Sequence, residues 1–296
     1  MSLKIVEFFG AIPGEAGWQT AAQKGDCPFI GGVCRKQLHD GTPSGVCTLA
    51  AAQNPTPVIC CPYRLYADDY AVLARIAREV FGQTAVLNLS RKGTPVGSLS
   101  VRLFGKDQGK ELRLPSRSNS GAYSVDWILA LVDEHEQLLE FVAVEIQTID
   151  TTGNYKKQRE DLAAGNANPE RSGAGFNWEN VNKRILPQII YKGHVLRRET
   201  LCKKGLYFVT PTPVCERVRA RLGDKMMSYQ PHPGSVTFHS YSLNTEVETQ
   251  PRPLVFDGAF TTTIDQLVVA FSSPTNLPKA GVYEEAIRKA LSDSAR

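Results

Sequence analysis

Two apolar runs in the middle of the chain are each interrupted by one carboxylate, Asp126 in the first run and Glu145 in the second. Their Val, Ile and Leu residues predict two strands, at about residues 123–132 and 139–148, joined by a polar turn at 133–137. Both faces of these strands are apolar, so we expect neighbouring strands in the centre of a sheet, covered by helices. The pattern therefore predicts two buried acidic residues side by side.

The rest of the chain has apolar residues at helical spacing in some segments and short apolar runs in others. Asp68 or Asp69 is expected to cap the first helix, Gly82 to end it, and Pro187 to kink a later one. Helices are predicted at residues 70–81, 154–165, 178–198, 213–222 and 281–293. Further strands are predicted at residues 85–89, 99–104, 111–114, 206–210, 235–243 and 258–263. Alternating helices and strands predict a mixed α/β fold.

The N-terminal part differs from the rest because it is rich in Gly, Pro and Cys and has little periodic structure up to residue 62. We expect a loop-rich lobe there, held together by a bound metal because it lacks a core of its own. The chain is accordingly predicted to contain a metal-binding lobe at residues 1–65, packed on a larger core at residues 66–296.

The composition is that of a globular protein, with 42% hydrophobic and 22% charged residues and no apolar stretch long enough to span a bilayer. Glu7 lies where a signal peptide would be apolar, so we expect a cytoplasmic protein without a membrane partner. The net charge of +4 permits binding to nucleic acid but is equally typical of a slightly basic enzyme.

Asp126 and Glu145 point to metal-assisted hydrolysis, because a carboxylate inside an apolar run is costly unless it is paired or holds a cation. Two of them on neighbouring strands would suit one shared Mg²⁺, which prefers oxygen ligands and promotes phosphodiester hydrolysis. The backbone carbonyl of Ile146 is a candidate third ligand, and Gln147, on the same side of the strand as Glu145, could orient a water. Alternatively, Asp126 is solvated at a strand edge and Glu145 pairs with an Arg or Lys.

Seven cysteines are present, and five of them lie between residues 27 and 61. In a reducing compartment such a cluster is more typical of a metal site than of disulfides. The spacing lacks a compact Cys-x-x-Cys pair, yet four thiolates on separate loops can form a closed tetrahedral site for zinc or iron. Buried free thiols are the alternative, and His39 is a substitute ligand. Cys202 and Cys215 are expected to be core residues or inert surface thiols.

A series of short segments between residues 6 and 192 occurs in the same order as in one family of known enzymes. The segments are residues 6–10, Cys27-Pro28-Phe29, Gly45-Val46-Cys47, Cys61-Pro62, Phe81-Gly82, Ser124-Val125-Asp126-Trp127, residues 145–150, 153–156 and 180–184, Gln188, and Tyr191-Lys192. Taken together, they resemble the NotI family of restriction endonucleases.

The resemblance implies a restriction-endonuclease-like core of the PD-(D/E)xK type, in which a central mixed β-sheet is flanked by helices, and it places this core and the DNA-recognition elements in residues 66–296. It also implies a Mg²⁺-dependent homodimer that cuts double-stranded DNA at a palindromic, GC-rich site. The family's catalytic places are taken here by Asp126, Glu145 and Gln147. Its structural iron, or zinc, would be bound by Cys27, Cys34, Cys47 and Cys61, with Cys60 as the extra cysteine.

Basic residues that follow the second acidic strand are candidates for contacts with DNA phosphates. They are Lys156, Lys157, Lys183 and Arg184, with Lys192 nearby. A solvated basic helix face is the alternative for each of them. Because Gln147 stands where many such nucleases have a lysine, a catalytically weak or inactive DNA-binding metalloprotein is a second hypothesis. A metal-sensing protein centred on the cysteines is a third.

Overall fold

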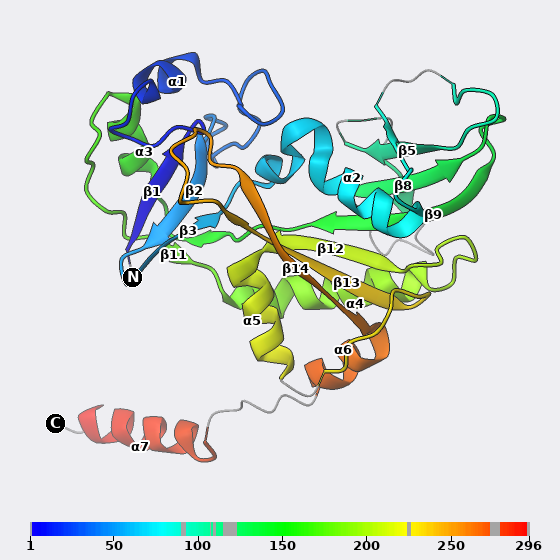
Figure 1. Cartoon of the computed structure of the whole chain (residues 1–296). Coiled ribbons are helices and arrows are strands. Elements are labelled where there is room, and N and C mark those ends of the chain that lie inside the picture. Colours follow the sequence, from blue (N-terminus) through cyan, green and yellow to red (C-terminus); the bar gives the residue numbers. More distant parts are fainter. Residues whose placement is uncertain are drawn as a thin grey trace.

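A seven-stranded mixed β-sheet forms the centre of the computed structural model, which describes residues 2–89, 93–106, 108, 111–114, 123–223, 226–272 and 279–294 (Figure 1). In order across the sheet, the strands are β14 (Leu254–Thr263), β13 (Ser235–Leu243), β12 (Leu206–Pro211), β9 (Leu138–Ile146), β8 (Trp127–Val132), β5 (Ser100–Gly105) and β4 (Leu87–Asn88). Strand β9 lies at the centre, where it pairs antiparallel with β8 and parallel with β12. The predicted central position of both acidic strands is confirmed.

Helices cover both faces of this sheet, as predicted (Figure 1). One face carries α2 (Ala67–Phe81), and the other carries α4 (Leu186–Leu196), α5 (Thr212–Leu222) and α6 (Ile264–Ser272). Side chains along β9 alternate between the two faces, so that Val144 belongs to the hydrophobic cluster under α2 and Ala143 to the cluster that contains α4. The alternation places Glu145 on the same face as Ala143, the face covered by α4.

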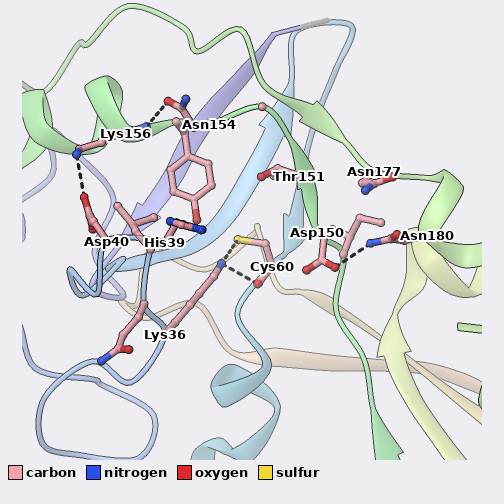
Figure 2. Close-up of a pocket in the computed structure, with 15 residues that line it drawn as sticks. Lys36, His39, Asp40, Cys60, Asp150, Thr151, Asn154, Lys156, Asn177 and Asn180 are labelled. Atoms are coloured by element: carbon pink, nitrogen blue, oxygen red, sulfur yellow. Dashed lines mark hydrogen bonds and ion pairs between the residues drawn. The ribbon is translucent and has the colours of Figure 1, made fainter. Parts of the chain in front are cut away.

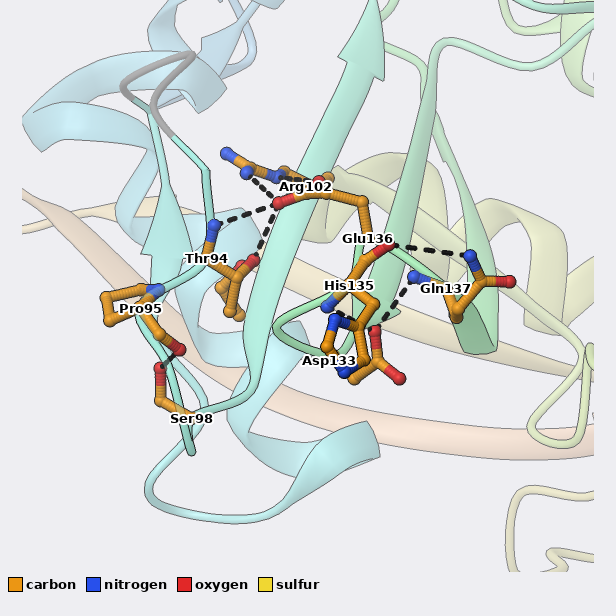
Figure 3. A network of polar contacts seen from close by, with 9 residues as sticks. Thr94, Pro95, Ser98, Arg102, Asp133, His135, Glu136 and Gln137 are labelled. Carbon is orange, nitrogen blue, oxygen red and sulfur yellow. Dashed lines mark hydrogen bonds and ion pairs between the residues drawn. The ribbon is translucent and has the colours of Figure 1, made fainter.

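A polar turn joins β8 and β9 and is held by side chains on both sides of it (Figure 3). Asp133 Oδ1 accepts hydrogen bonds from the backbone N–H groups of His135 and Gln137, at 2.8 and 2.9 Å. Glu136 adopts a positive φ of 58° and forms an ion pair with Arg102 of β5, with Nη2 2.5 Å from Oε1. A turn fixed in this way sets the register of the two strands, and the register decides which residues face each other.

The N-terminal part contains more regular structure than its composition predicts. An antiparallel sheet is formed by β1 (Leu3–Phe8), β2 (Val46–Ala51) and β3 (Asn54–Ile59). Leu3, Ile5 and several neighbours belong to the same hydrophobic cluster as the residues of α4. The expectation of a loop-rich lobe without a core was therefore wrong, because the small sheet shares the core of the larger part.

A buried ion pair ties this small sheet to the rest of the chain. Arg64 Nη1 lies 2.5 Å from Glu7 Oε2, and neither side chain is more than 1% exposed. Thr48 Oγ1 donates to the same oxygen at 2.9 Å, and the backbone N–H of Arg252 donates to Glu7 Oε1 at 3.3 Å. Segments that are distant in the sequence meet at Glu7, so this buried carboxylate joins the small sheet to the segment that precedes β14.

Two predicted features near the acidic strands and the first helix differ from the structure. The first acidic strand is interrupted, because β7 (Tyr123–Ser124) ends before Asp126 and β8 begins after it. Asp68 and Asp69 both have positive φ and lie inside the first turn of α2, which has no side-chain cap. Aspartate tolerates this left-handed conformation better than most residues, which favours it in an irregular first turn.

The helix expected at residues 178–198 consists of a π-helical turn, η2 (Val181–Ile185), that leads into α4 immediately before Pro187. The strand predicted at 235–243 coincides with β13. The remaining elements are α1 (Trp18–Lys24), η1 (Pro62–Tyr66), β6 (Arg113–Leu114), β10 (Thr151–Thr152), α3 (Lys156–Ala163), β11 (Gly175–Phe176) and α7 (Val282–Ser294). Within the described ranges, no helix is long and apolar enough to span a bilayer.

Candidate active site

The two acidic residues meet where β8 begins and β9 ends. Trp127 pairs with Val144 in the antiparallel register, so the next pair outward is Asp126 and Glu145. Residues directly opposite each other in an antiparallel pair point to the same face of a sheet. Asp126 Oδ2 also accepts a hydrogen bond from the backbone N–H of Ile146 at 2.8 Å, which holds its carboxylate against the end of β9. The structure thus brings together the two carboxylates that the sequence analysis singled out.

Burial makes this pair of carboxylates costly to ionise. Burial raises the pKa of Asp126, against the lowering effect of the Ile146 N–H. Burial and the charge of Asp126 raise the pKa of Glu145 to about 7. Among the described residues, Glu145 Oε2 is buried without a hydrogen-bond partner. A buried oxygen without a donor is destabilising, so this site is chemically suited to a cation.

The donors present fit a hard divalent ion that keeps part of its water shell. Carboxylate and carbonyl oxygens are the ligands that Mg²⁺ prefers, and it commonly uses one or two protein carboxylates beside several waters. Over the ranges that the structure describes, no three His, Cys, Asp or Glu residues form a metal-binding group. Two carboxylates alone, with Glu145 Oε2 free, therefore match Mg²⁺ better than an ion that needs a full protein cage.

Gln147 continues from the end of β9 and lies beside the acidic pair. Its backbone N–H donates to Val209 O at 3.0 Å, which extends the pairing with β12, and its side-chain Nε2 donates to Thr148 O at 2.9 Å. Gln147 and Asp126 line one cavity of about 450 Å³, together with Lys106. The amide can orient a water or a phosphate there by hydrogen bonds but carries no charge.

The partner of Glu145 is a lysine that the sequence analysis had placed only among possible phosphate contacts. Lys192 Nζ, from α4, lies 2.5 Å from Glu145 Oε1. The alternative in which Glu145 pairs with a Lys is therefore realised, together with the convergence of the two acids. The signal that could have identified Lys192 is its position in the buried stripe of α4, between Ile189 and Leu196.

A larger cavity of about 680 Å³ adjoins the first and shares Lys36, Gln37, Cys60 and Asp150 with it (Figure 2). It lies between the N-terminal part and the core, and polar side chains line it. Those drawn in Figure 2 include His39, Asp40, Asn154, Asn177 and Asn180. The two cavities together form a polar depression beside the acidic pair.

The predicted DNA-contacting residues lie in different surroundings. Lys156 lines the larger cavity, where its Nζ is 2.8 Å from Asp40 Oδ2 (Figure 2). Lys157 is 80% exposed and lies 3.9 Å from Glu170. Lys183 forms an ion pair with Glu179 one helical turn away, and Arg184 Nη1 lies 3.8 Å from Asp150 Oδ2. Of the four, Lys156 is the one that lines a described cavity.

All seven cysteines are buried, so that Cys202 and Cys215 are core residues rather than surface thiols. The four predicted ligands Cys27, Cys34, Cys47 and Cys61 do not form a metal-binding group among the described residues. Burial raises the pKa of Cys61 to about 12 and that of Cys47 well above its ordinary value. Cys47 and Cys61 are therefore protonated at neutral pH, and the described residues do not assemble the ligand set of an iron or zinc site.

The extra cysteine, Cys60, has a lysine ammonium group within hydrogen-bonding distance of its sulfur. Lys36 Nζ donates to Cys60 O at 2.8 Å and lies 3.4 Å from Cys60 Sγ, as Figure 2 shows. It also donates to Val46 O at 3.4 Å. The ammonium group thus joins the end of β3 to the start of β2.

Comparison with known proteins assigns the family. No curated protein matches the chain. The family model described as restriction endonuclease NotI matches residues 13–209, more than half of the 296 residues. The match includes Asp126, Glu145, Gln147 and the five N-terminal cysteines, and it ends in β12. This chain belongs to the NotI family of restriction endonucleases, enzymes that bind double-stranded DNA and cleave it.

Proposed function

We propose that this chain is a type II restriction endonuclease that hydrolyses double-stranded DNA phosphodiesters with Mg²⁺, at a specific palindromic, GC-rich site, with a PD-(D/E)xK core. The family supports DNA cleavage. One observation carries the assignment of the site: Asp126 and Glu145 face each other across β8 and β9, with Glu145 Oε2 buried and unpartnered. The enzyme is proposed to act in the cytoplasm, where its DNA substrate is present.

Asp126 and Glu145 would hold the Mg²⁺, with the backbone carbonyl of Ile146 as a third ligand. When bound, Mg²⁺ supplies charge for the phosphate oxygens and lowers the pKa of an attacking water. Asp126 is fixed for this task by the Ile146 N–H, at 2.8 Å. Gln147 lines the same cavity as Asp126 and orients the water or the scissile phosphate through its amide.

The test removes one carboxylate at a time. Asp126→Ala and Glu145→Ala are expected to abolish cleavage of DNA in Mg²⁺. Asp126→Ala is expected to retain the thermal transition and DNA binding in EDTA, whereas Glu145→Ala leaves the buried Lys192 ammonium unpaired and is expected to unfold at a lower temperature while it still binds DNA. Asp265→Ala is a matched control, because that carboxylate is 73% exposed and distant in sequence from both cavities. Cleavage at the wild-type rate by either active-site variant would show that the assignment is wrong.

DNA binding is proposed to use the polar depression formed by the two cavities. Lys156 lines it directly, and Lys157, Lys183 and Arg184 are proposed to contact phosphates from the helices that follow Gln147. We also propose that the enzyme acts as a homodimer, since a palindromic site presents two equivalent half-sites to a two-fold assembly. Light scattering of the protein in solution measures its mass against 32.5 kDa for one chain.

A structural metal bound by Cys27, Cys34, Cys47 and Cys61 is a separate proposal. It is supported by the resemblance to the family and by the burial of all four thiols. The described thiols do not form a ligand group, so no role in catalysis is derived from it. Elemental analysis of the purified protein decides: one iron or zinc per chain is expected, and a metal-free, folded protein would refute it.

The second candidate function, a DNA-binding protein without cleavage, rests on Gln147, whose amide already donates to Thr148 O. Plasmid DNA incubated with Mg²⁺, with Mn²⁺ and with EDTA separates the two functions. Linear product in Mg²⁺ alone or in both metals supports the nuclease, whereas binding without linear product in any condition supports the second function.

A further inference from the structure

A buried lysine reaches the proposed active site from α4, a helix that covers one face of the central sheet. Lys192 belongs to α4, and its side chain is 8% exposed, while that of Glu145 is 11% exposed. Lysine side chains usually keep the ammonium group in water, and a buried ammonium is costly unless it is paired. The pairing partner here is Glu145 Oε1, at 2.5 Å. A buried ion pair therefore lies at the place where the two acidic strands meet.

The position of this lysine in α4 shows that it does not serve packing alone. Leu186, Ile189, Gly193 and Leu196 are the other buried residues of the helix, and all are apolar. An apolar residue at position 192 would complete this stripe without the cost of burying a charge. The ammonium group of Lys192 is therefore explained by its partner, Glu145 at the end of β9.

The strand itself supplies no positive charge at this place. Gln147 follows Glu145 by two positions, where a Glu-x-Lys arrangement would have an ammonium group, and its amide is neutral. Lys106 also lines the cavity of Asp126, but it is exposed on the segment after β5. Among the described lysines of this region, Lys192 is the one within hydrogen-bonding distance of either carboxylate.

The two oxygens of Glu145 have different surroundings. Oε1 accepts from Lys192, while Oε2 is buried and has no partner among the described residues. A carboxylate fixed through one oxygen presents the other in one direction, which is the kind of support that orients metal ligands.

We propose that Lys192 is a positioning residue of the nuclease site: it holds Glu145 through Oε1, so that Oε2 is presented to the divalent ion. From α4, Lys192 also supplies the positive charge that the neutral Gln147, at the end of β9, does not provide. This inference rests on the proposed function. It assigns to α4 a direct part in the site, beyond its packing against the sheet.

The experiment uses the full-length protein and the isosteric neutral variant Lys192→Met. In Mg²⁺, its single-turnover cleavage rate is expected to fall by about 100-fold, a typical cost of losing one preorganised charge in an active site. The ratio of DNA affinity in Ca²⁺ to that in EDTA is expected to fall by about tenfold or more, because Glu145 has lost the donor that fixes it. DNA affinity in EDTA alone is expected to stay near that of the wild type.

Relocating the charge distinguishes a positioning role from a structural one. The double variant Lys192→Met/Gln147→Lys is expected to recover the cleavage rate by about tenfold or more over Lys192→Met, since the ammonium group returns from the strand side. Arg197→Met is the matched control, because it removes an exposed ion pair with Asp265 from the end of the same helix. Its cleavage rate and calcium response are expected to equal those of the wild type.

Several results would overturn the inference. They are a cleavage rate of Lys192→Met within about threefold of wild type, a loss that Gln147→Lys does not repair, or a larger loss in Lys106→Met than in Lys192→Met. If Lys192→Met does not fold, the charge-conserving variant Lys192→Arg decides: it is expected to keep the calcium response of DNA binding seen in the wild type, and loss of that response in a folded Lys192→Arg protein would overturn the inference. Cleavage by Asp126→Ala would refute the proposed function itself, independently of Lys192.

Discussion

Replacing Asp126 by asparagine should make the metal-free protein more stable at alkaline pH. Asparagine keeps the shape and an oxygen that can still accept from the Ile146 N–H, but it removes one of the two buried charges. Glu145 then no longer faces a like charge, which is the second largest cause of its raised pKa after burial. The substitution therefore separates the electrostatic cost of the site from its packing.

The magnitude follows from the pKa of Glu145. A carboxyl group whose pKa rises from 4.5 to about 7 on folding costs the folded protein about 3 kcal/mol once it is ionised. Burial accounts for the larger share, so the charge of Asp126 accounts for about 1 kcal/mol. For a chain of 296 residues, a gain of that magnitude corresponds to a rise in Tm of about 1–2 °C.

The pH dependence of this gain has a definite sign. The folded pKa of Glu145 lies above its unfolded value, so its contribution to stability is fully present below pH 4.5 and is lost as the pH rises through about 7. At pH 5 the folded wild-type protein has taken up the proton, and the variant has little to gain. The difference between the variant and the wild type should therefore be largest at pH 8 and should nearly vanish at pH 5.

The assay is thermal or urea unfolding of wild type and Asp126→Asn in EDTA at both pH values, repeated at pH 8 with excess Mg²⁺. Mg²⁺ should stabilise the wild type and not the variant, which reverses their order. Asp265→Asn removes an exposed carboxylate and should show no such pH dependence. A variant that is less stable than wild type at pH 8 in EDTA, or equally shifted at both pH values, would refute this reasoning.

Three further predictions concern the neighbourhood of the site. Gln147→Ala should slow single-turnover cleavage in saturating Mg²⁺ by about 10- to 100-fold without changing the Tm in EDTA, because it removes hydrogen bonds to water or phosphate and no packing; an unchanged rate would contradict its role. Arg64→Met should lower the free energy of unfolding in urea by about 3–5 kcal/mol, because it leaves Glu7 buried without its ion partner, and a loss below about 1 kcal/mol would argue against the anchoring role of the pair. Lys156→Ala should weaken DNA binding for all sequences and reduce the slope of log affinity against log salt by about 1, and an unchanged slope would remove Lys156 from the phosphate contacts.

Local patterns in the sequence predicted the elements whose apolar residues repeat within one segment. The strand predicted at 235–243 coincides with β13, and the helix predicted from residue 70 ends at Phe81, as α2 does. The two acidic strands were predicted for the same reason, because a carboxylate inside an apolar run is visible without knowledge of the fold. Their convergence followed from the short turn at 133–137, which allows little else than antiparallel pairing.

The N-terminal sheet could not be read from local patterns. Its strands β1 and β2 pair residues that are 38 to 48 positions apart, and no local pattern in either segment indicates its partner. Pro55 and Pro57 lie in the edge strand β3, where they give the sequence the appearance of a loop. The cysteines and glycines of the segment reinforced that reading. The buried carboxylate of Glu7 depends on Arg64, which is 57 positions away in the sequence.

Lys192 shows the same limit within the active site. Its pairing with Glu145 spans 47 positions and depends on how α4 crosses the sheet, which no periodicity reveals. A local sign was present, since a lysine interrupts the apolar stripe of a helix in the way that Asp126 and Glu145 interrupt apolar strands. Charged residues in apolar patterns identified the site from the strands, and the same criterion applied to the helix identifies the third member.

Digestion of genome-sized DNA by the purified protein, with sequencing of the fragment ends, tests most directly whether Asp126 and Glu145 support cation-dependent cleavage. In Mg²⁺, the wild type should produce discrete fragments whose ends share one sequence and carry 5′-phosphates, while EDTA or Glu145→Ala should leave the DNA intact. Discrete fragments from Glu145→Ala, or intact DNA with the wild type in both Mg²⁺ and Mn²⁺, would contradict the assignment of the two carboxylates.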